Sequence, residues 1–367
     1  MTQDVPAFHR ADRMFKKNRQ SRERRQSSAK QRNRALLTLI AGVLLAFTSC
    51  KEEKKDQKRY LPDSVGAINS LAVVIDNDMW NGEVGDEIRE YYAAPVDGLP
   101  WDEPVFTLHQ IPLQVFKGST TKSRNILFVR KDSTTNSGIK TDAYAHPQKV
   151  GVIEAPDNGT LIDMIGKTSA QYIKEFKDND IVENQKRFRS SLNKETYLQK
   201  KFGISLTMPY VYKTSKQEDN FIWIERVIPK GSMHIFVYEL PINSIPDDST
   251  RVDAFIKMND SIGQKYVPGR EEGMYMVTQQ AYAPYIFDIT LAGKPTIEVK
   301  GMWEMKNFAM AGPFVCYLIR DEENDRLLVL EGLTFAPSED KRDYMFELEA
   351  ILKSVKFISE KTPDQKP

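Results

Sequence analysis

Hydrophobic positions along the chain fall into runs and stripes that predict a series of strands and helices between residues 62 and 358. Residues 68–75 are mostly apolar, as in a buried strand, and Asp76-Asn77-Asp78 follows them. From Trp80 to Tyr92 apolar residues recur every three or four positions, which predicts an amphipathic helix that ends near Pro95. Further strands are predicted at 105–116, 125–131 and 149–154.

A long helical pattern follows these strands. Thr160-Leu161-Ile162-Asp163 resembles a capping box with Asp in place of Glu or Gln, so the helix should begin there. Its apolar stripe continues to Leu192, and the polar triplet at 178–180 predicts a break in the helix.

The same order of a short motif and a strand then appears a second time. Phe106-x-Leu108 precedes the predicted strand at 125–129, and the similar Leu206-x-Met208-Pro209 precedes the predicted strand at 220–224. Each is followed by another strand (150–153; 233–240) and a helix (from 160; from 249). The pattern suggests a duplication, although short matches of this kind also arise by chance.

The last third is rich in strands, at 274–280, 296–305, 314–320 and 326–335, and a helix with an apolar stripe closes it at 344–355. Residues 327–330 are apolar without alternation, as in a strand covered on both faces. The order of these elements predicts an α+β fold of mostly antiparallel sheet with helices packed on one face. If the repeat is real, the two halves are duplicated α/β sandwiches. The expected boundaries are 1–49 signal peptide, 50–60 tether, 61–200 and 201–358 folded halves, and 359–367 disordered tail.

The N-terminal segment carries a different pattern. Residues 1–34 hold eleven Lys and Arg against three acids, residues 35–47 are apolar, and Thr48-Ser49 precedes Cys50. A run of 13 apolar residues spans only about 20 Å as a helix, which is short for a membrane span. The arrangement resembles a bacterial lipoprotein signal, with the basic stretch as its cytoplasmic flank. Phe47 departs from the usual Leu, Val or Ile, Met14 is an alternative start, and an uncleaved signal anchor is the alternative reading.

The lipoprotein resemblance implies that Cys50 is lipidated, becomes the first residue of the exported chain, and anchors the protein in the outer membrane. Residues 50–59 are almost all charged or amide and are expected to form a tether. Lys51-Glu52-Glu53 also resembles an export tag of Bacteroidota surface lipoproteins. Both the periplasmic face and the cell surface therefore remain open as locations.

Removing the signal changes the charge balance. The chain has 52 basic and 51 acidic residues, and without residues 1–34 it keeps 41 and 48, a net charge of −7. An acidic exported chain argues against nucleic acid as a partner. Cys316 is the only cysteine besides Cys50, so an intramolecular disulfide is excluded once Cys50 carries lipid.

Several short motifs are spread over nearly the whole exported chain. They are Gly66-x-Ile68-Asn69, Trp80-x-Gly82-x-x-Gly85-Asp86, Gly98-Leu99-Pro100, Glu103-Pro104, Gly301-x-Trp303, Gly312-Pro313-Phe314-Val315, Ala336-Pro337 and Lys341-Arg342. Together they resemble the Bacteroidota lipoprotein family of domain of unknown function 4837. The resemblance implies a secreted lipoprotein and brings no established activity or catalytic residues. The second half, with Pro209, the Trp223 strand and the closing helix, also looks faintly like the PsbP/Mog1 sandwich, a fold that often serves as a non-enzymatic assembly or binding module.

Recognised catalytic and metal motifs are missing from the sequence. Gly166-Lys167-Thr168 ends like a P-loop, but Leu161 stands where its first glycine should be. The histidines of the exported chain are scattered, which argues against a metal site, and no cofactor is expected. His234 and Cys316 each alternate with aromatic or aliphatic residues on a strand, which favours structural roles.

Three tryptophans beside acidic residues are the candidate ligand-binding positions. Asp78 lies next to Trp80 at a strand-to-helix turn, where capping and the helix dipole explain the acids equally well. Trp101 lies in a Gly-Leu-Pro loop, and Trp303 is followed by Glu304. Exposed aromatics beside acids would suit a glycan or peptide, and simple packing is the competing explanation.

Three functions remain open after the sequence. The first is a non-enzymatic, lipid-anchored module that binds an envelope protein or a glycan. The second is a hydrolase of envelope or external polymers, in which two carboxylates such as Asp78 and Glu304 would have to meet in a cleft. The third is a structural spacer without a ligand.

Overall fold

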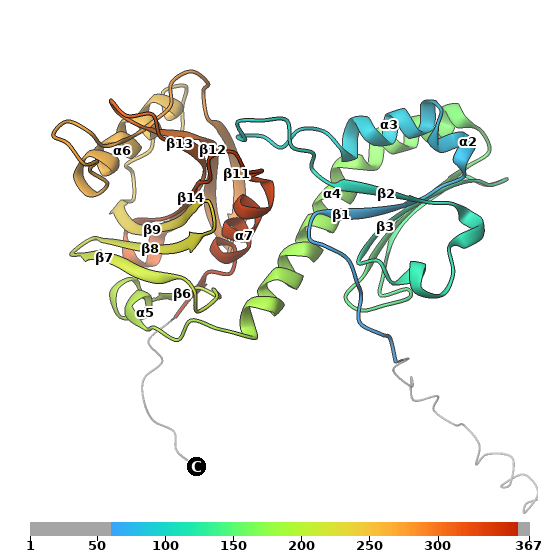
Figure 1. Ribbon diagram of the computed structural model, residues 1–367, viewed down its shortest axis with the longest axis horizontal. Coiled ribbons are helices and arrows are strands. Elements are labelled where there is room, and N and C mark those ends of the chain that lie inside the picture. Colours follow the sequence, from blue (N-terminus) through green and yellow to red (C-terminus); the bar gives the residue numbers. More distant parts are fainter. Residues whose placement is uncertain (1–59, 359–367) are drawn as a thin grey trace, which may run out of the picture. The chain divides into compact units, whose positions relative to one another are not determined.

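Two β-sheets of five and eight strands organise the chain (Figure 1). The computed structural model describes residues 60–358, and from Leu61 onward these residues form one compact unit. The predicted signal peptide (1–49), the predicted tether (50–60, beginning with Cys50) except its last residue, and the predicted disordered tail (359–367) lie outside the described residues.

The five-stranded sheet has the order β2-β1-β3-β5-β4. It is built from β1 (Ser70–Val74), α2 (Asn77–Trp80), α3 (Glu83–Tyr92), β2 (Thr107–Ile111), two 3₁₀ turns (Leu113–Val115 and Gly118–Lys122), β3 (Asn125–Lys131), β4 (Asn136–Thr141), β5 (Lys149–Ala155) and α4 (Asn158–Arg189).

This sheet differs from the antiparallel expectation, because β2, β1, β3 and β5 run parallel and only β4 is antiparallel. The cause lies in the connections, since α2 and α3 carry the chain back to the starting edge before β2 begins. Both helices and α4 cover one face, where Val84, Ile88, Leu161 and Phe176 pack on β1 and β3 (Figure 1).

Helix α4 is continuous for 32 residues, so the break predicted at 178–180 is wrong. Asn179 and Asp180 do not end the helix; their side chains are buried and form hydrogen bonds with residues outside it. Asp180 accepts the backbone N–H of Asn69 and pairs with Arg124 at 3.1 Å, while Asn179 donates to Asn125 Oδ1. The helix also starts earlier than predicted, because Asp157 caps it by accepting the N–H of Thr160.

The eight-stranded sheet is antiparallel throughout, which confirms the prediction for this half. Its main path is β10-β12-β13-β14-β9-β8-β7, with β11 also on β12. The elements of this half are α5 (Tyr197–Phe202), β6 (Ile204–Ser205), β7 (Lys213–Glu218), β8 (Phe221–Ile228), β9 (Gly231–Pro241), α6 (Arg251–Tyr266), β10 (Met276–Thr278), β11 (Tyr285–Leu291), β12 (Lys294–Met305), β13 (Ala311–Asp321), η3 (Glu322–Asn324), β14 (Arg326–Phe335), α7 (Arg342–Leu352) and β15 (Lys356–Phe357). β6 and β15 pair with each other in a separate two-stranded sheet.

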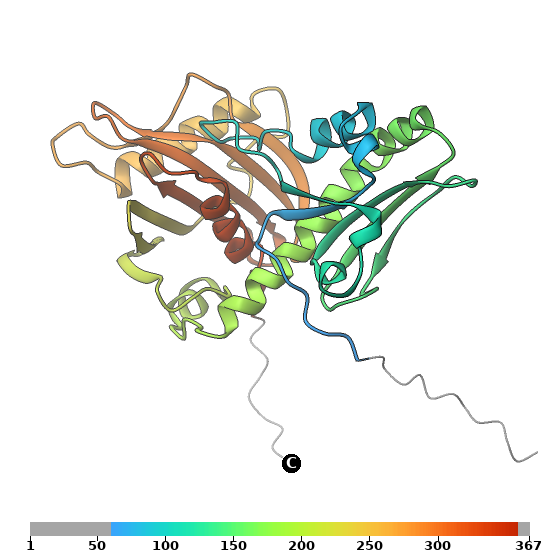
Figure 2. The same ribbon diagram turned by 45° about the vertical axis from the view of Figure 1, so that its right-hand side comes forward.

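The large sheet carries helices on both faces, where the sequence predicted one (Figures 1 and 2). On one face Leu348 and Ile351 of α7 join the core with Leu328 and Leu330 of β14. On the other, Phe255 of α6 joins the core that contains the opposite side chains of β14 and β13. The apolar run 327–330 is therefore covered on both sides, as its lack of alternation predicted.

The mixed α+β class is confirmed, whereas the suggested repeat is not found. One sheet is mainly parallel with the order β2-β1-β3-β5-β4, and the other is antiparallel with consecutive hairpins. Two folds with different strand directions cannot be superimposed as copies of one plan. The similar motifs at 106–108 and 206–209 therefore precede strands that belong to two different sheets.

Candidate functional site

The loop between α3 and β2, residues 95–104, connects the two halves of the folded unit. Glu103 accepts the backbone N–H groups of Lys341 and Arg342, at 2.7 and 2.8 Å, through its two carboxylate oxygens. These donors lie at the start of α7, which has no cap from its own neighbourhood. A carboxylate at this position satisfies free N–H groups and the positive end of the helix dipole.

Gly98 places the same loop against β12. Its φ of +82° is in the left-handed region, and a Cβ there would lie 3.0 Å from Lys300 Cβ and 3.2 Å from Gly301 N. Only glycine combines this conformation with so close an approach. The motifs Gly98-Leu99-Pro100 and Gly301-x-Trp303 are thus neighbours, as are Glu103-Pro104 and Lys341-Arg342.

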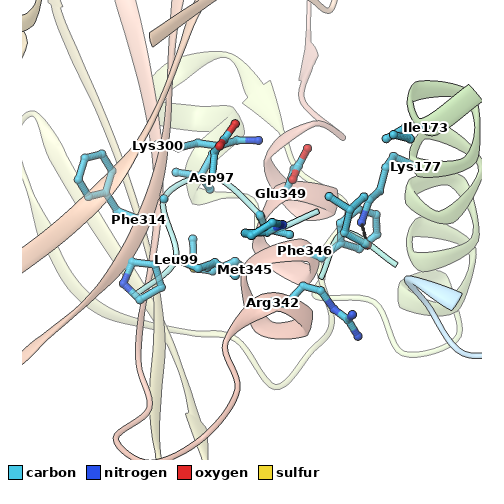
Figure 3. A pocket seen from close by; sticks show the side chains of 16 residues that line it. Asp97, Leu99, Ile173, Lys177, Lys300, Phe314, Arg342, Met345, Phe346 and Glu349 are labelled. Carbon is cyan, nitrogen blue, oxygen red and sulfur yellow. Dashed lines mark hydrogen bonds between the residues drawn. The ribbon is translucent and has the colours of Figure 1, made fainter. Parts of the chain in front are cut away.

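A cavity of about 220 Å³, called here the inner cavity, lies on one side of the loop (Figure 3). Lys177 reaches towards it from α4, Arg342 and Glu349 belong to α7, and Lys300 comes from β12. The rest of the wall is mainly apolar and includes Val96, Leu99, Val105, Ile173, Phe314, Met345 and Phe346.

Lys177 is the lining cation of this cavity that takes part in none of the ion pairs found in the described part of the chain. Its ammonium donates to Asn69 Oδ1 at 2.8 Å and to the carbonyl of Val105 at 2.6 Å, and both acceptors are neutral. It also lies 4.5 and 4.9 Å from the ring centres of Phe106 and Phe346. Burial lowers the pKa of Lys177 to about 7, in spite of more distant carboxylates.

Glu349 on the same wall is already paired. Its carboxylate forms an ion pair with Lys353. Burial raises the pKa of Glu349, but Lys353 and Lys300 outweigh burial, so that the pKa falls to about 2. The carboxylate is therefore fully charged at neutral pH.

A larger cavity of about 640 Å³, called here the outer groove, lies on the other side of the loop. Three aromatic side chains at its wall are about half exposed or more: Trp101 at 50 %, Tyr282 at 77 % and Tyr285 at 48 %. The ammonium of Lys341 lies 3.9 Å from the Trp101 ring centre and holds that ring by a cation–π contact. Gln279 adds an amide to the lining.

The structure separates the predicted binding residues. Trp101 lines the outer groove. Trp303 is 2 % exposed, so it cannot be a contact platform, although its indole nitrogen lies directly behind Gly312 in the groove wall. Glu304 stands beside it and accepts a hydrogen bond of 3.1 Å from Gln279. Trp303 and Glu304 therefore support the wall and do not form the binding surface.

Asp78 and Trp80 belong to a different part of the chain. Asp78 is exposed in the short helix α2, and Trp80 is partly buried under the guanidinium of Arg89 at 4.7 Å. Neither they nor Glu304 line the inner cavity or the outer groove. The carboxylate pair Asp78 and Glu304 is thus not brought together in either cavity.

Two other residues have the structural roles that the sequence favoured. Cys316 is fully buried with Phe314 and Leu318, and burial raises its pKa well above the usual thiol value. His234 accepts the indole N–H of Trp223 at 3.0 Å, and burial lowers its pKa to about 4. The imidazole is therefore neutral at physiological pH.

Sequence reasoning missed Lys177, Lys300, Arg342, Glu349, Tyr282 and Tyr285. Lys177 had a weak signal, because it is a charged residue one turn after Ile173 and next to Phe176 on the apolar stripe of α4. In residues 60–358 there is no group of three or more His, Cys, Asp or Glu side chains that could hold a metal ion. None of the described helices is both long and apolar enough to cross a membrane.

Two family models match successive parts of the chain. Residues 64–189 match a domain of unknown function, DUF8532, and residues 191–354 match another, DUF4837. A search of curated proteins gave no match.

Two solved structures resemble part of the chain. The Ran-binding protein Mog1p of Saccharomyces cerevisiae is 12 % identical, with a TM-score of 0.30 over 46 % of this chain and 97 % of that protein. The protein of unknown function PA94 from Pseudomonas aeruginosa is 10 % identical, with a TM-score of 0.24 over 41 % and 88 %. The described chain is therefore similar over 64–189 to one domain of unknown function and over 191–354 to another.

Proposed function

We propose that this protein is a non-enzymatic, lipid-anchored module of the bacterial envelope and that the outer groove binds a glycan. The observation that carries the proposal is the grouping of Trp101, Tyr282 and Tyr285 on one groove. Exposed large aromatics that share one hollow are unusual on a surface that has no partner.

The chemistry of the groove suits a sugar chain. The faces of aromatic rings pack against the apolar C–H faces of pyranose rings, while phenol and amide groups bind hydroxyls. Tyr282 and Tyr285 supply both kinds of contact, and Gln279 is held in place by Glu304.

The lipid anchor follows from the sequence around Cys50. A diacylglyceryl group on that residue, followed by a short charged tether, keeps the folded unit close to the outer membrane, at its periplasmic face or on the cell surface. Mass spectrometry of the N-terminal peptide tests the anchor, and protease treatment of intact against lysed cells distinguishes the two faces. An unmodified, unprocessed N-terminus contradicts it.

Glycan binding is tested with the detergent-solubilised full chain on a glycan array that includes peptidoglycan fragments and surface polysaccharides. Replacing Trp101 or Tyr282 by Ala should weaken binding about fivefold or more, because each lost ring contact is worth about 1 kcal/mol or more. Tyr210→Ala is the matched control, since Tyr210 is 55 % exposed outside the groove. Equal binding by all three variants, or capture of an envelope protein through Trp101 in place of any glycan, contradicts the proposal.

A further inference from the structure

The inner cavity is a second hollow, smaller than the outer groove and lined, apart from the shared residues 95–99, by different residues. Its volume of about 220 Å³ exceeds the cavity of about 150 Å³ that is known to hold benzene in another protein. A ligand of roughly six to ten heavy atoms therefore fits. The lining of Leu99, Ile173, Phe314 and Phe346 would contact an apolar body (Figure 3).

Five charged side chains line the inner cavity: the cations Lys177, Lys300 and Arg342 and the carboxylates Asp97 and Glu349, so the lining has one more positive than negative charge. Glu349 pairs with Lys353, Arg342 with Asp343 at 2.9 Å and Lys300 with Glu298 at 3.6 Å, while Asp97 is exposed to solvent. Lys177 takes part in none of the ion pairs found in residues 60–358, because its acceptors are an amide and a carbonyl oxygen. An unpaired ammonium beside mainly apolar side chains is costly, and an anion brought to it removes part of that cost.

We propose that the inner cavity binds a small carboxylate with an apolar body, whose charged end pairs with Lys177 and whose body lies between Ile173, Phe346 and Leu99. A neutral molecule of the same shape gains the apolar contacts but leaves Lys177 uncompensated. The site therefore selects for charge as well as for size. This inference does not depend on glycan binding in the outer groove.

The surroundings of Lys177 make the binding depend on pH. Burial lowers the pKa of Lys177 to about 7; the more distant Glu349 and Asp180 raise it, and Arg342 and Lys300 lower it. A bound carboxylate stabilises the charged ammonium and raises this pKa. Binding should therefore be accompanied by proton uptake near pH 7. Above pH 7 the affinity should fall as the pH rises, by up to about tenfold per pH unit.

The experiment is calorimetric titration of the detergent-solubilised full chain with hexanoate and with hexanamide, an uncharged compound of nearly the same shape, after subtraction of detergent-only heats. Hexanoate should bind at least tenfold more tightly than hexanamide at pH 6. Repeating the titration in two buffers of different ionisation heat at pH 7 measures the proton uptake. Equal affinity for the two compounds, or no hexanoate binding at millimolar concentration, overturns the inference.

Variants test the role of Lys177 directly. Lys177→Met should abolish the preference for hexanoate over hexanamide, and Lys177→Arg should keep it. Lys174→Met is the matched control, because Lys174 lies one turn away on α4 with a side chain 75 % exposed. Trp101→Ala should leave hexanoate binding unchanged, which separates this site from the outer groove. Loss of the preference in the Lys174 variant, or its survival in a folded Lys177→Met, contradicts the proposal.

Discussion

Glu331 on β14 is a carboxyl group inside the core beneath α6. It has no exposed surface, and neither carboxylate oxygen has a hydrogen-bond partner in residues 60–358. Burial raises its pKa from 4.5 to about 8, and only the amide of Asn259 works against this. The group is therefore held mainly as a neutral acid at pH 7.

The stability consequence follows from the two pKa values. Between pH 4.5 and 8 the unfolded chain releases this proton while the folded chain keeps it, so the free energy of unfolding falls as the pH rises. At 1.36 kcal/mol per pH unit, the loss is about 3 kcal/mol at pH 7 and about 5 kcal/mol above pH 8. Gln has nearly the same volume and cannot ionise.

Glu331→Gln should therefore raise the free energy of unfolding by about 2 to 4 kcal/mol at pH 8. This range already subtracts about 1 kcal/mol, because the buried amide of Gln is poorly hydrogen-bonded. At pH 4.5 the gain should disappear. Urea unfolding followed by tryptophan fluorescence from pH 4.5 to 8 measures the difference between variant and parent, which cancels other titrating groups. Glu323→Gln is the exposed control. Parallel stability curves for Glu331→Gln and the parent across this range would refute the reasoning.

Two further substitutions test the contacts that position the site. Glu103→Ala should lower the free energy of unfolding by about 1 to 2 kcal/mol, because α7 loses the acceptor of its first N–H groups, whereas Asp340→Ala beside it should change stability by less than about 0.5 kcal/mol. Equal effects in urea unfolding would show that the cap is not stabilising. Asp180→Ala should cost about 3 to 5 kcal/mol, since it leaves the buried guanidinium of Arg124 without its carboxylate, and the exposed Asp178→Ala should not. A loss below 1 kcal/mol for Asp180→Ala contradicts this.

The sequence predicted the strands that are rich in buried apolar side chains and missed two polar strands at sheet edges. β3 and β14 were placed at their observed bounds because apolar residues dominate both. β4 and β7 are polar edge strands with almost no buried side chain, so no periodicity marks them. Their backbone pairing supplies the stability that their side chains do not.

The cavities depended on contacts far apart in sequence, which no local pattern contains. Lys177 and Arg342 are 165 positions apart, and each alone looks like an ordinary surface residue. Trp101 was a correct choice for an exposed aromatic, because a Gly-Leu-Pro loop offers little cover. Trp303 was misjudged, since the neighbouring acid Glu304 faces away from the core on the same strand while the indole faces into it.

The cap that Glu103 places on α7 has a consequence for how the chain can be divided. The two family segments meet near residue 190, yet the last helix of the second begins on a carboxylate that belongs to the first. A fragment starting at 191 would keep its antiparallel sheet and lose the acceptor at that helix, along with the wall of both hollows. The boundary between families is thus not a boundary between independent folding units, and expression of either half alone should give a less cooperative protein.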